Sequence, residues 1–240
     1  MFSSARRILW ITLTLFVMIP AVSSADERYF VMIFGSELKS KRPKYTHTWA
    51  TWVKATGEGP NLCEYQLECN TISWMPATLD IRPWTHKSEP GVNLDLHPTM
   101  KLMRSFDEDI SLWGPYEVYQ SSWDRFVAQR EYLESGNVRY LCVNFLSNDI
   151  NDKGCIHAIT DADPRRGRET YRLYRFGVNA SHNIARQFWQ RNRIINPELD
   201  HSWLLGRLSL TQYPIYRREY IHRDGPFDDF GWRLRGTMTE

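Results

Sequence analysis

The sequence predicts an α+β protein, because strand-like segments fill its first half and segments with helical periodicity its second. Apolar residues make up 42% and charged residues 24% of the 240 residues, which are globular values. Aromatic residues are dense at 14%, so a chain of this length can bury a substantial core. The composition excludes a wholly disordered chain and a protein with many membrane spans.

Strand signals come first along the chain. Residues 29–34 are a continuous apolar run typical of a buried strand, and residues 47–54 are rich in Thr, Trp and Val. A Gly- and Pro-containing turn follows at residues 57–60. Shorter strands are expected at residues 63–69, 70–75, 79–81 and 138–145. The proline-rich stretch 83–100 is expected to be a long irregular connection.

Helical periodicity dominates the second half. In residues 121–133 apolar side chains recur at helical spacing, and a Ser-Gly pair ends the segment. The remaining helices are expected at residues 155–162, 180–191 and 199–210. Together these signals give the order of elements in the predicted α+β domain.

The first 25 residues have the three-part pattern of a secretory signal peptide. Arg6 and Arg7 form a positive start, residues 8–22 are apolar, and Ser23-Ser24-Ala25 supplies small residues before the cleavage point. The apolar run is shorter than a membrane span and is interrupted by a proline, so we expect cleavage and no stable membrane insertion. The sequence therefore predicts a secreted or periplasmic protein.

Removal of this segment also changes the net charge. Two of the 30 Lys and Arg residues lie in it, so 28 remain against 28 Asp and Glu. A neutral chain has no field that attracts nucleic acid, and we expect no nucleic-acid partner. The mature chain is expected to form one globular α+β domain over residues 26–223, followed by a loosely packed tail over residues 224–240.

The strongest sequence motifs of known enzymes are missing. The sequence contains no phosphate-binding loop, dinucleotide fingerprint, Gly-x-Ser-x-Gly elbow or His-Glu-x-x-His pair. The scattered histidines do not have metal-ligand spacing, so neither a metal nor a cofactor is expected.

Cys155 is the best candidate nucleophile. It follows Gly154 at the start of a predicted helix, where free N–H groups and the helix dipole favour a thiolate and can stabilise an oxyanion. A thiolate nucleophile needs a base, and His47, at the start of a β-rich segment, can face a helix terminus. His157 is a poorer base candidate, because two residues along a helix it points to another side.

These motifs resemble those of the circularly permuted branch of the papain-like cysteine hydrolases. That branch includes bacterial cell-envelope peptidases and amidases and the lecithin:retinol acyltransferase-like enzymes, in which a strand-borne His, as in Tyr45-Thr-His47, precedes a Cys at a helix start. Gly-Cys155-Ile-His157 also looks like the acyltransferase-like motif. As a whole, the chain also looks like exported bacterial proteins, for which the resemblance supplies no activity.

The resemblance implies a papain-like fold, with a small antiparallel sheet packed against helices, and roles for three residues. Cys155 would be the nucleophile, His47 the base and Asn70 the polar residue that orients the imidazole. The substrate would be a peptide or acyl compound, cell-wall peptide among them, cleaved or transferred through a thioester. The chain departs from this branch at Gly154, where family members often have Asn.

The cysteines leave a second hypothesis open. Cys63, Cys69, Cys142 and Cys155 are an even set in an exported chain, which permits two disulfides. Cys63 and Cys69 are close enough in sequence for a hairpin bridge with Cα atoms within about 7 Å. Cys142 and Cys155 can also pair, or Cys155 can be a free thiol. With both bridges formed, the chain would be a non-catalytic secreted binding or structural domain.

Overall fold

The computed structural model describes residues 25–143, 147, 149–162, 176–191, 193–218 and 237–238. The predicted signal peptide, apart from Ala25, lies outside the described residues. So does the predicted tail, apart from residues 237–238. No helix in the described part of the chain is both long and apolar enough to cross a membrane.

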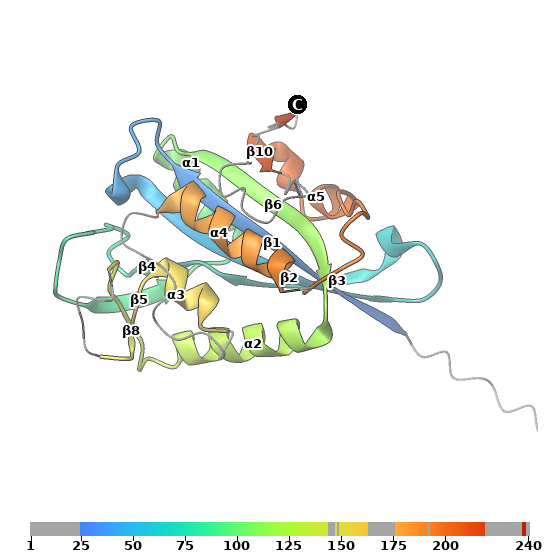
Figure 1. Ribbon diagram of the computed structural model, residues 1–240, viewed down its shortest axis with the longest axis horizontal. Helices are drawn as coiled ribbons and strands as arrows, with labels where there is room; N and C mark the ends of the chain where they lie inside the picture. Colours follow the sequence, from blue (N-terminus) through green and yellow to red (C-terminus); the bar gives the residue numbers. More distant parts are fainter. Residues whose placement is uncertain are drawn as a thin grey trace, which may run out of the picture.

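The fold is mixed α+β, as predicted, and is built on two sheets (Figure 1). The larger sheet has the order β11-β10-β6-β1-β2-β3, with β9 paired to the end of β6. Its strands are β1 (Asp26–Glu37), β2 (Thr46–Gly57), β3 (Gln66–Ile72), β6 (Asp109–Val118), β9 (Ile194–Ile195), β10 (Ile215–Arg218) and β11 (Thr237–Met238). Only the β10–β6 pair is parallel among the described strands of this sheet.

The smaller sheet has the order β4-β5-β7-β8. Its strands are β4 (Trp74–Pro76), β5 (Glu89–Asn93), β7 (Arg139–Tyr140) and β8 (Asp152–Lys153). β7 and β8 run parallel, and the other two pairs are antiparallel.

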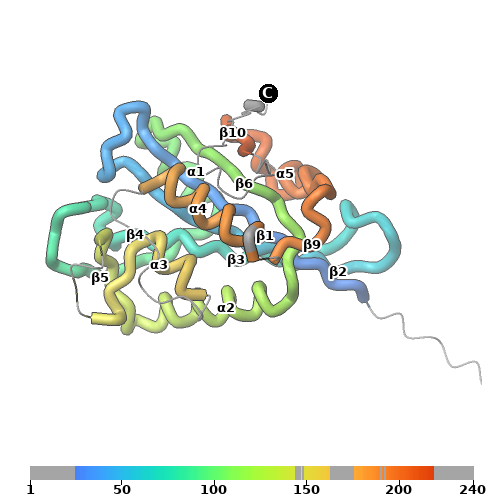
Figure 2. The backbone as a smooth tube through the Cα atoms, in the orientation of Figure 1, coloured from blue at the N-terminus to red at the C-terminus, as the bar shows by residue number. Residues whose placement is uncertain are grey.

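Helices cover both faces of the larger sheet. They are α1 (Leu96–Ser105), α2 (Gln120–Glu134), α3 (Cys155–Thr160), α4 (Gly177–Gln190) and α5 (Trp203–Arg207). Short 3-10 turns lie at Pro43–Tyr45, Leu62–Glu64 and Leu210–Gln212. In Figures 1 and 2, α4 lies along β1 and β2, and α3 lies between α4 and α2.

The alternation of side chains along β1 separates two apolar cores. Phe30, Met32 and Phe34 pack with α1 and α5 on one face. Tyr29, Val31 and Ile33 pack with α2, α3 and α4 on the other. Because both faces are buried, β1 is almost continuously apolar, which is why its sequence reveals it so clearly.

Some expected elements differ in the structure. Residues 79–81 form no strand, because Leu79 has a left-handed backbone (φ 56°) that breaks extended structure. The stretch 83–100 is not wholly irregular, since it contains β5 and the start of α1. The expected strand at 138–145 is described only as β7, and residues 144–146 lie outside the described residues. The expected helix at 199–210 is shortened to α5.

Candidate active site

Cys155 is the first residue of α3, as the sequence predicts. Burial dominates the pKa of this thiol, and the backbone N–H groups of Thr48, Ile156 and Cys155 itself partly oppose it by favouring the thiolate. The net effect raises that pKa to about 11, so the resting thiol is protonated at neutral pH. A charged ligand or substrate oxygen at this position would meet the same N–H groups.

The N–H of Thr48 is accessible to α3 because β3 does not pair with the first residues of β2. β2 pairs with β1 over its whole length, whereas its pairing with β3 begins only at Ala50, opposite Ile72. Among the described residues, the first residues of β2 therefore form an open sheet edge without a strand partner on this side. α3 packs against β2, and its first residue lies near Thr48. This edge brings the segment that carries Cys155 next to the segment that carries His47.

The loop before α3 is closely packed against residues 141–142. A Cβ atom on Gly154 would lie 2.7 Å from the carbonyl oxygen of Cys142 and 3.0 Å from that of Leu141. The Asn that the resembling enzymes often have at this position therefore does not fit this backbone arrangement. Glycine is required here by space and not by conformation, because Gly154 is extended (φ −88°, ψ 172°).

Cys142 is the thiol next to Cys155. The two thiols interact, and burial together with the neighbouring Cys155 raises the pKa of Cys142 to about 12. Tyr140 lies beside them, and its phenol pKa is raised mainly by burial. All four cysteines are free and none is at disulfide distance from another, so both disulfides remain predictions.

His47 is completely buried near the start of β2. Its ring stacks on Trp49 with 5.5 Å between centroids, and its Nε2 shares a hydrogen bond of 2.9 Å with Ser73 Oγ. Burial lowers the pKa of the imidazole to about 3, so the resting ring is neutral. Nδ1 has no hydrogen-bond partner among the described residues, which leaves one nitrogen able to accept a proton.

Ser73 is a candidate orienting residue that the sequence reasoning missed. It lies between β3 and β4, where its N–H donates to Asn93 Oδ1 (2.9 Å) and its carbonyl accepts from the N–H of Leu94 (3.1 Å). These bonds fix the Ser73 backbone. The hydroxyl is thereby held at the imidazole of His47.

Asn70 lies elsewhere on β3. It is the register partner of Trp52, and its Oδ1 accepts a hydrogen bond of 3.3 Å from Arg130 on α2. The structure thus places Cys155 near the backbone of Thr48, the neighbour of His47, but the His47 ring stacks on Trp49 in the core on the α1 and α5 face and has a different polar partner. No hydrogen bond joins His47 to Cys155 among the described residues.

Metal-ligating side chains do not gather at this edge. The described residues contain no group of three or more His, Cys, Asp or Glu side chains that could hold a metal ion. Comparison of the chain with protein-family models, with curated proteins and with solved structures finds no match.

Proposed function

We propose that this protein is an exported, papain-like cysteine hydrolase or acyltransferase that acts on amide or ester bonds through a thioester on Cys155. The observation that carries the proposal is the open edge of β2. There Cys155, the first residue of α3, lies near the backbone N–H of Thr48, and the residue before Thr48 is the strand-borne His47.

The proposed reaction begins with a neutral thiol and a neutral imidazole, because burial disfavours both ions. As the sulfur attacks the acyl carbon, the thiol proton passes to Nδ1 of His47 and the carbonyl oxygen gains negative charge. The backbone N–H groups near Cys155 are suitable donors for that oxygen. The imidazolium returns the proton to the leaving amine or alcohol. Water or a second nucleophile then releases the acyl group from the thioester.

Ser73 is proposed to orient the imidazole. In the tautomer that the proposal requires, Nε2 carries the ring proton and donates it to Ser73 Oγ, which leaves Nδ1 as the proton acceptor. The stack on Trp49 limits ring rotation. This assigns to Ser73 the part that the family resemblance gives to Asn70. Peptide and acyl compounds, including cell-wall peptide, remain the proposed substrates by resemblance alone.

The test is direct detection of the thioester. Residues 26–240 are incubated with p-nitrophenyl acyl esters and quenched in acid, and the Cys155 peptide is examined by mass spectrometry. We expect an acyl mass increase on that peptide that neutral hydroxylamine removes. Cys155→Ala should abolish it, and His47→Asn should lose nearly as much rate, because nucleophile and base act as a unit.

Matched variants separate this proposal from general thiol reactivity. Cys142→Ala removes the neighbouring thiol and should leave acylation of Cys155 in place. Ser73→Ala should slow acylation more than Asn70→Ala, the corresponding change on β3. Thermal melts check that each variant folds.

Two results would contradict the proposal. One is acylation that is unchanged in folded His47→Asn protein. The other is a folded wild-type protein that never forms the adduct and in which Cys155→Ala lowers only the melting temperature. The second result would favour the non-catalytic secreted domain.

A further inference from the structure

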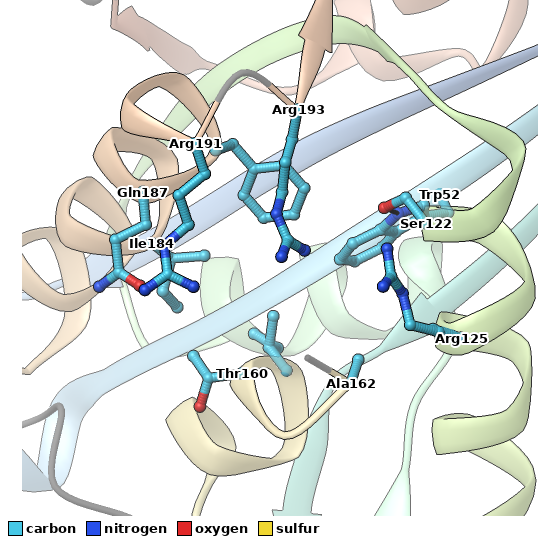
Figure 3. Close-up of a pocket in the computed structure, with 11 residues that line it drawn as sticks. Trp52, Ser122, Arg125, Thr160, Ala162, Ile184, Gln187, Arg191 and Arg193 are labelled. Carbon is cyan, nitrogen blue, oxygen red and sulfur yellow. Dashed lines mark hydrogen bonds between the residues drawn. The ribbon is translucent and has the colours of Figure 1, made fainter. Parts of the chain in front are cut away.

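A pocket lies where α2, α3 and α4 meet over β2 (Figure 3). The empty space between its lining atoms is about 470 Å³, which includes open solvent at its mouth. Apolar side chains from three elements form much of its lining: Trp52 from β2, Ile159 from α3, and Ile184 and Phe188 from α4. Such a surface removes the apolar part of a small ligand from water.

Three arginines also line the pocket. Arg125 comes from α2, Arg191 follows the end of α4, and Arg193 precedes β9. Figure 3 shows their guanidinium groups directed toward the space between the helices. No Asp or Glu is among the described residues that line it. This concentration of positive charge stands out in a mature chain whose basic and acidic residues are equal in number.

Helix electrostatics explain only part of this charge. Arg191 and Arg193 lie at the C-terminal end of α4, where cations are favoured. Arg125 lies in the first half of α2, where a cation gains nothing from the helix dipole, and its Nη2 is 3.4 Å from Ser121 Oγ. Arg191 and Arg193 also have interactions of their own, so the argument rests on the combined charge and not on an unpaired guanidinium.

The pocket is held in shape by packing and hydrogen bonds. Trp52 donates from Nε1 to Ser122 Oγ (3.1 Å) and stacks on Phe126 with 3.5 Å between ring centroids. The N–H of Arg193 donates to the carbonyl of Phe188 (3.1 Å), which fixes this arginine beside the last turn of α4. The apolar lining residues, called the floor of the pocket below, are therefore held in place, and a preformed site loses little conformational entropy when a ligand binds.

We propose that this pocket binds a small amphiphilic anion, in which an apolar body contacts the floor and a carboxylate or phosphate contacts the arginines. Charge complementarity selects the anion, since arginine pairs with both groups through charge-assisted hydrogen bonds. Trp52, Phe188 and the two isoleucines select an apolar body over a fully polar ion. The site is independent of the chemistry proposed for Cys155, which lies at the opposite end of α3 from Ile159 and Thr160.

Calorimetric titration of residues 26–240 with a set of small probes tests the proposal. The probes are octyl phosphate, octanoate, octanol, octylammonium and inorganic phosphate. We expect the two amphiphilic anions to bind at least about tenfold more tightly than octanol, octylammonium or inorganic phosphate. Equal binding of octanol and octyl phosphate would overturn the role of the arginines. Equal binding of inorganic and octyl phosphate would overturn the role of the floor.

Single-charge variants locate the site. Arg125→Gln should weaken octyl phosphate about tenfold and leave octanol unchanged. Lys101→Gln removes one positive charge from the exposed side of α1, on the other face of the sheet, and should leave both unchanged. A folded Arg125→Gln protein that binds octyl phosphate like the wild type would refute the proposal. So would wild-type protein that binds neither anion because the chain's own carboxylates neutralise the arginines.

Discussion

Glu108 makes the stability of this protein depend on pH. Glu108 lies directly before β6 and is only 2% exposed, and its carboxyl group accepts a hydrogen bond from Ser36 Oγ. Burial raises the pKa of Glu108 from 4.5 to about 7, although the bond from Ser36 lowers it. The folded state therefore binds this proton more tightly than the unfolded state. Between these two pKa values the free energy of unfolding must fall as pH rises.

The shift sets the size of the effect. At 1.36 kcal/mol for each pKa unit, the difference between 4.5 and about 7 corresponds to about 3 kcal/mol of stability, present at low pH and lost above pH 7. Glu108→Gln keeps an acceptor for Ser36 but cannot ionise. The variant should therefore be more stable than the wild type by about 3 kcal/mol in mildly alkaline buffer, with little difference near pH 4.

Urea denaturation across this pH range measures the difference. Glu58→Gln, which removes an exposed carboxylate, is the matched control and should show almost no pH-dependent difference. If the difference between Glu108→Gln and the wild type is the same at every pH, Glu108 does not titrate in this range. If the wild type instead gains stability relative to Glu108→Gln as pH rises, the sign of the pKa shift is wrong.

Two further substitutions test the packing around the site. Gly154→Ala places a Cβ atom 2.7 Å from the carbonyl oxygen of Cys142, so residues 141–142 must move. We expect the free energy of unfolding, measured by urea denaturation, to fall by about 1–3 kcal/mol. A variant as stable as the wild type would show that this loop can move without cost. Ser181→Ala removes the hydroxyl that donates to the carbonyl of Phe34 (2.6 Å) and should lower the free energy of unfolding by about 1–2 kcal/mol. The same change at exposed Ser105 is the control and should have little effect. Equal losses at the two serines would refute the importance of this contact between α4 and β1.

The fold class and the locally encoded elements could be predicted from the sequence. β1 is an apolar run, and α2 and α4 carry helical periodicity, so each is visible without knowledge of its neighbours. β6 was not predicted, because Gly114-Pro115 in its centre has the composition of a turn. Its identity as a strand comes from pairing with β1, which lies far away in the sequence.

α1 was hidden for a related reason. Pro98 made its segment look irregular, yet Pro98 lies in the first turn of the helix, where a backbone N–H has no intrahelical partner to lose. The local composition was read correctly as a proline-rich segment. Only the position of the proline within the helix, which tertiary packing decides, makes it compatible with α1.

In the candidate site, too, some residues follow from local sequence patterns and one depends on the pairing of distant segments. Cys155 at a helix start and His47 on a strand follow from local patterns, and the structure places both as expected. The polar partner of His47 depends on the register between β2 and β3. That register pairs Trp52 with Asn70 and, continued by one residue beyond Ala50 and Ile72, would place Ser73 opposite Trp49. Knowledge of this register would therefore have favoured Ser73 over Asn70 as the polar partner of His47. The length of the loop between β2 and β3 does not determine the register by itself.

The position of β1 in the larger sheet has a consequence for how the chain folds. β1 is the first strand described in the sequence, yet it lies in the interior of the sheet, between β2 and β6. During synthesis β2 follows at once and can close a hairpin, whereas the edge of β1 that pairs with β6 must wait until residues 109–118 emerge. Until then an apolar strand edge is unprotected and open to pairing with other chains. Such long-range pairing also slows folding, so we expect the nascent chain to need a holding chaperone until β6 is available.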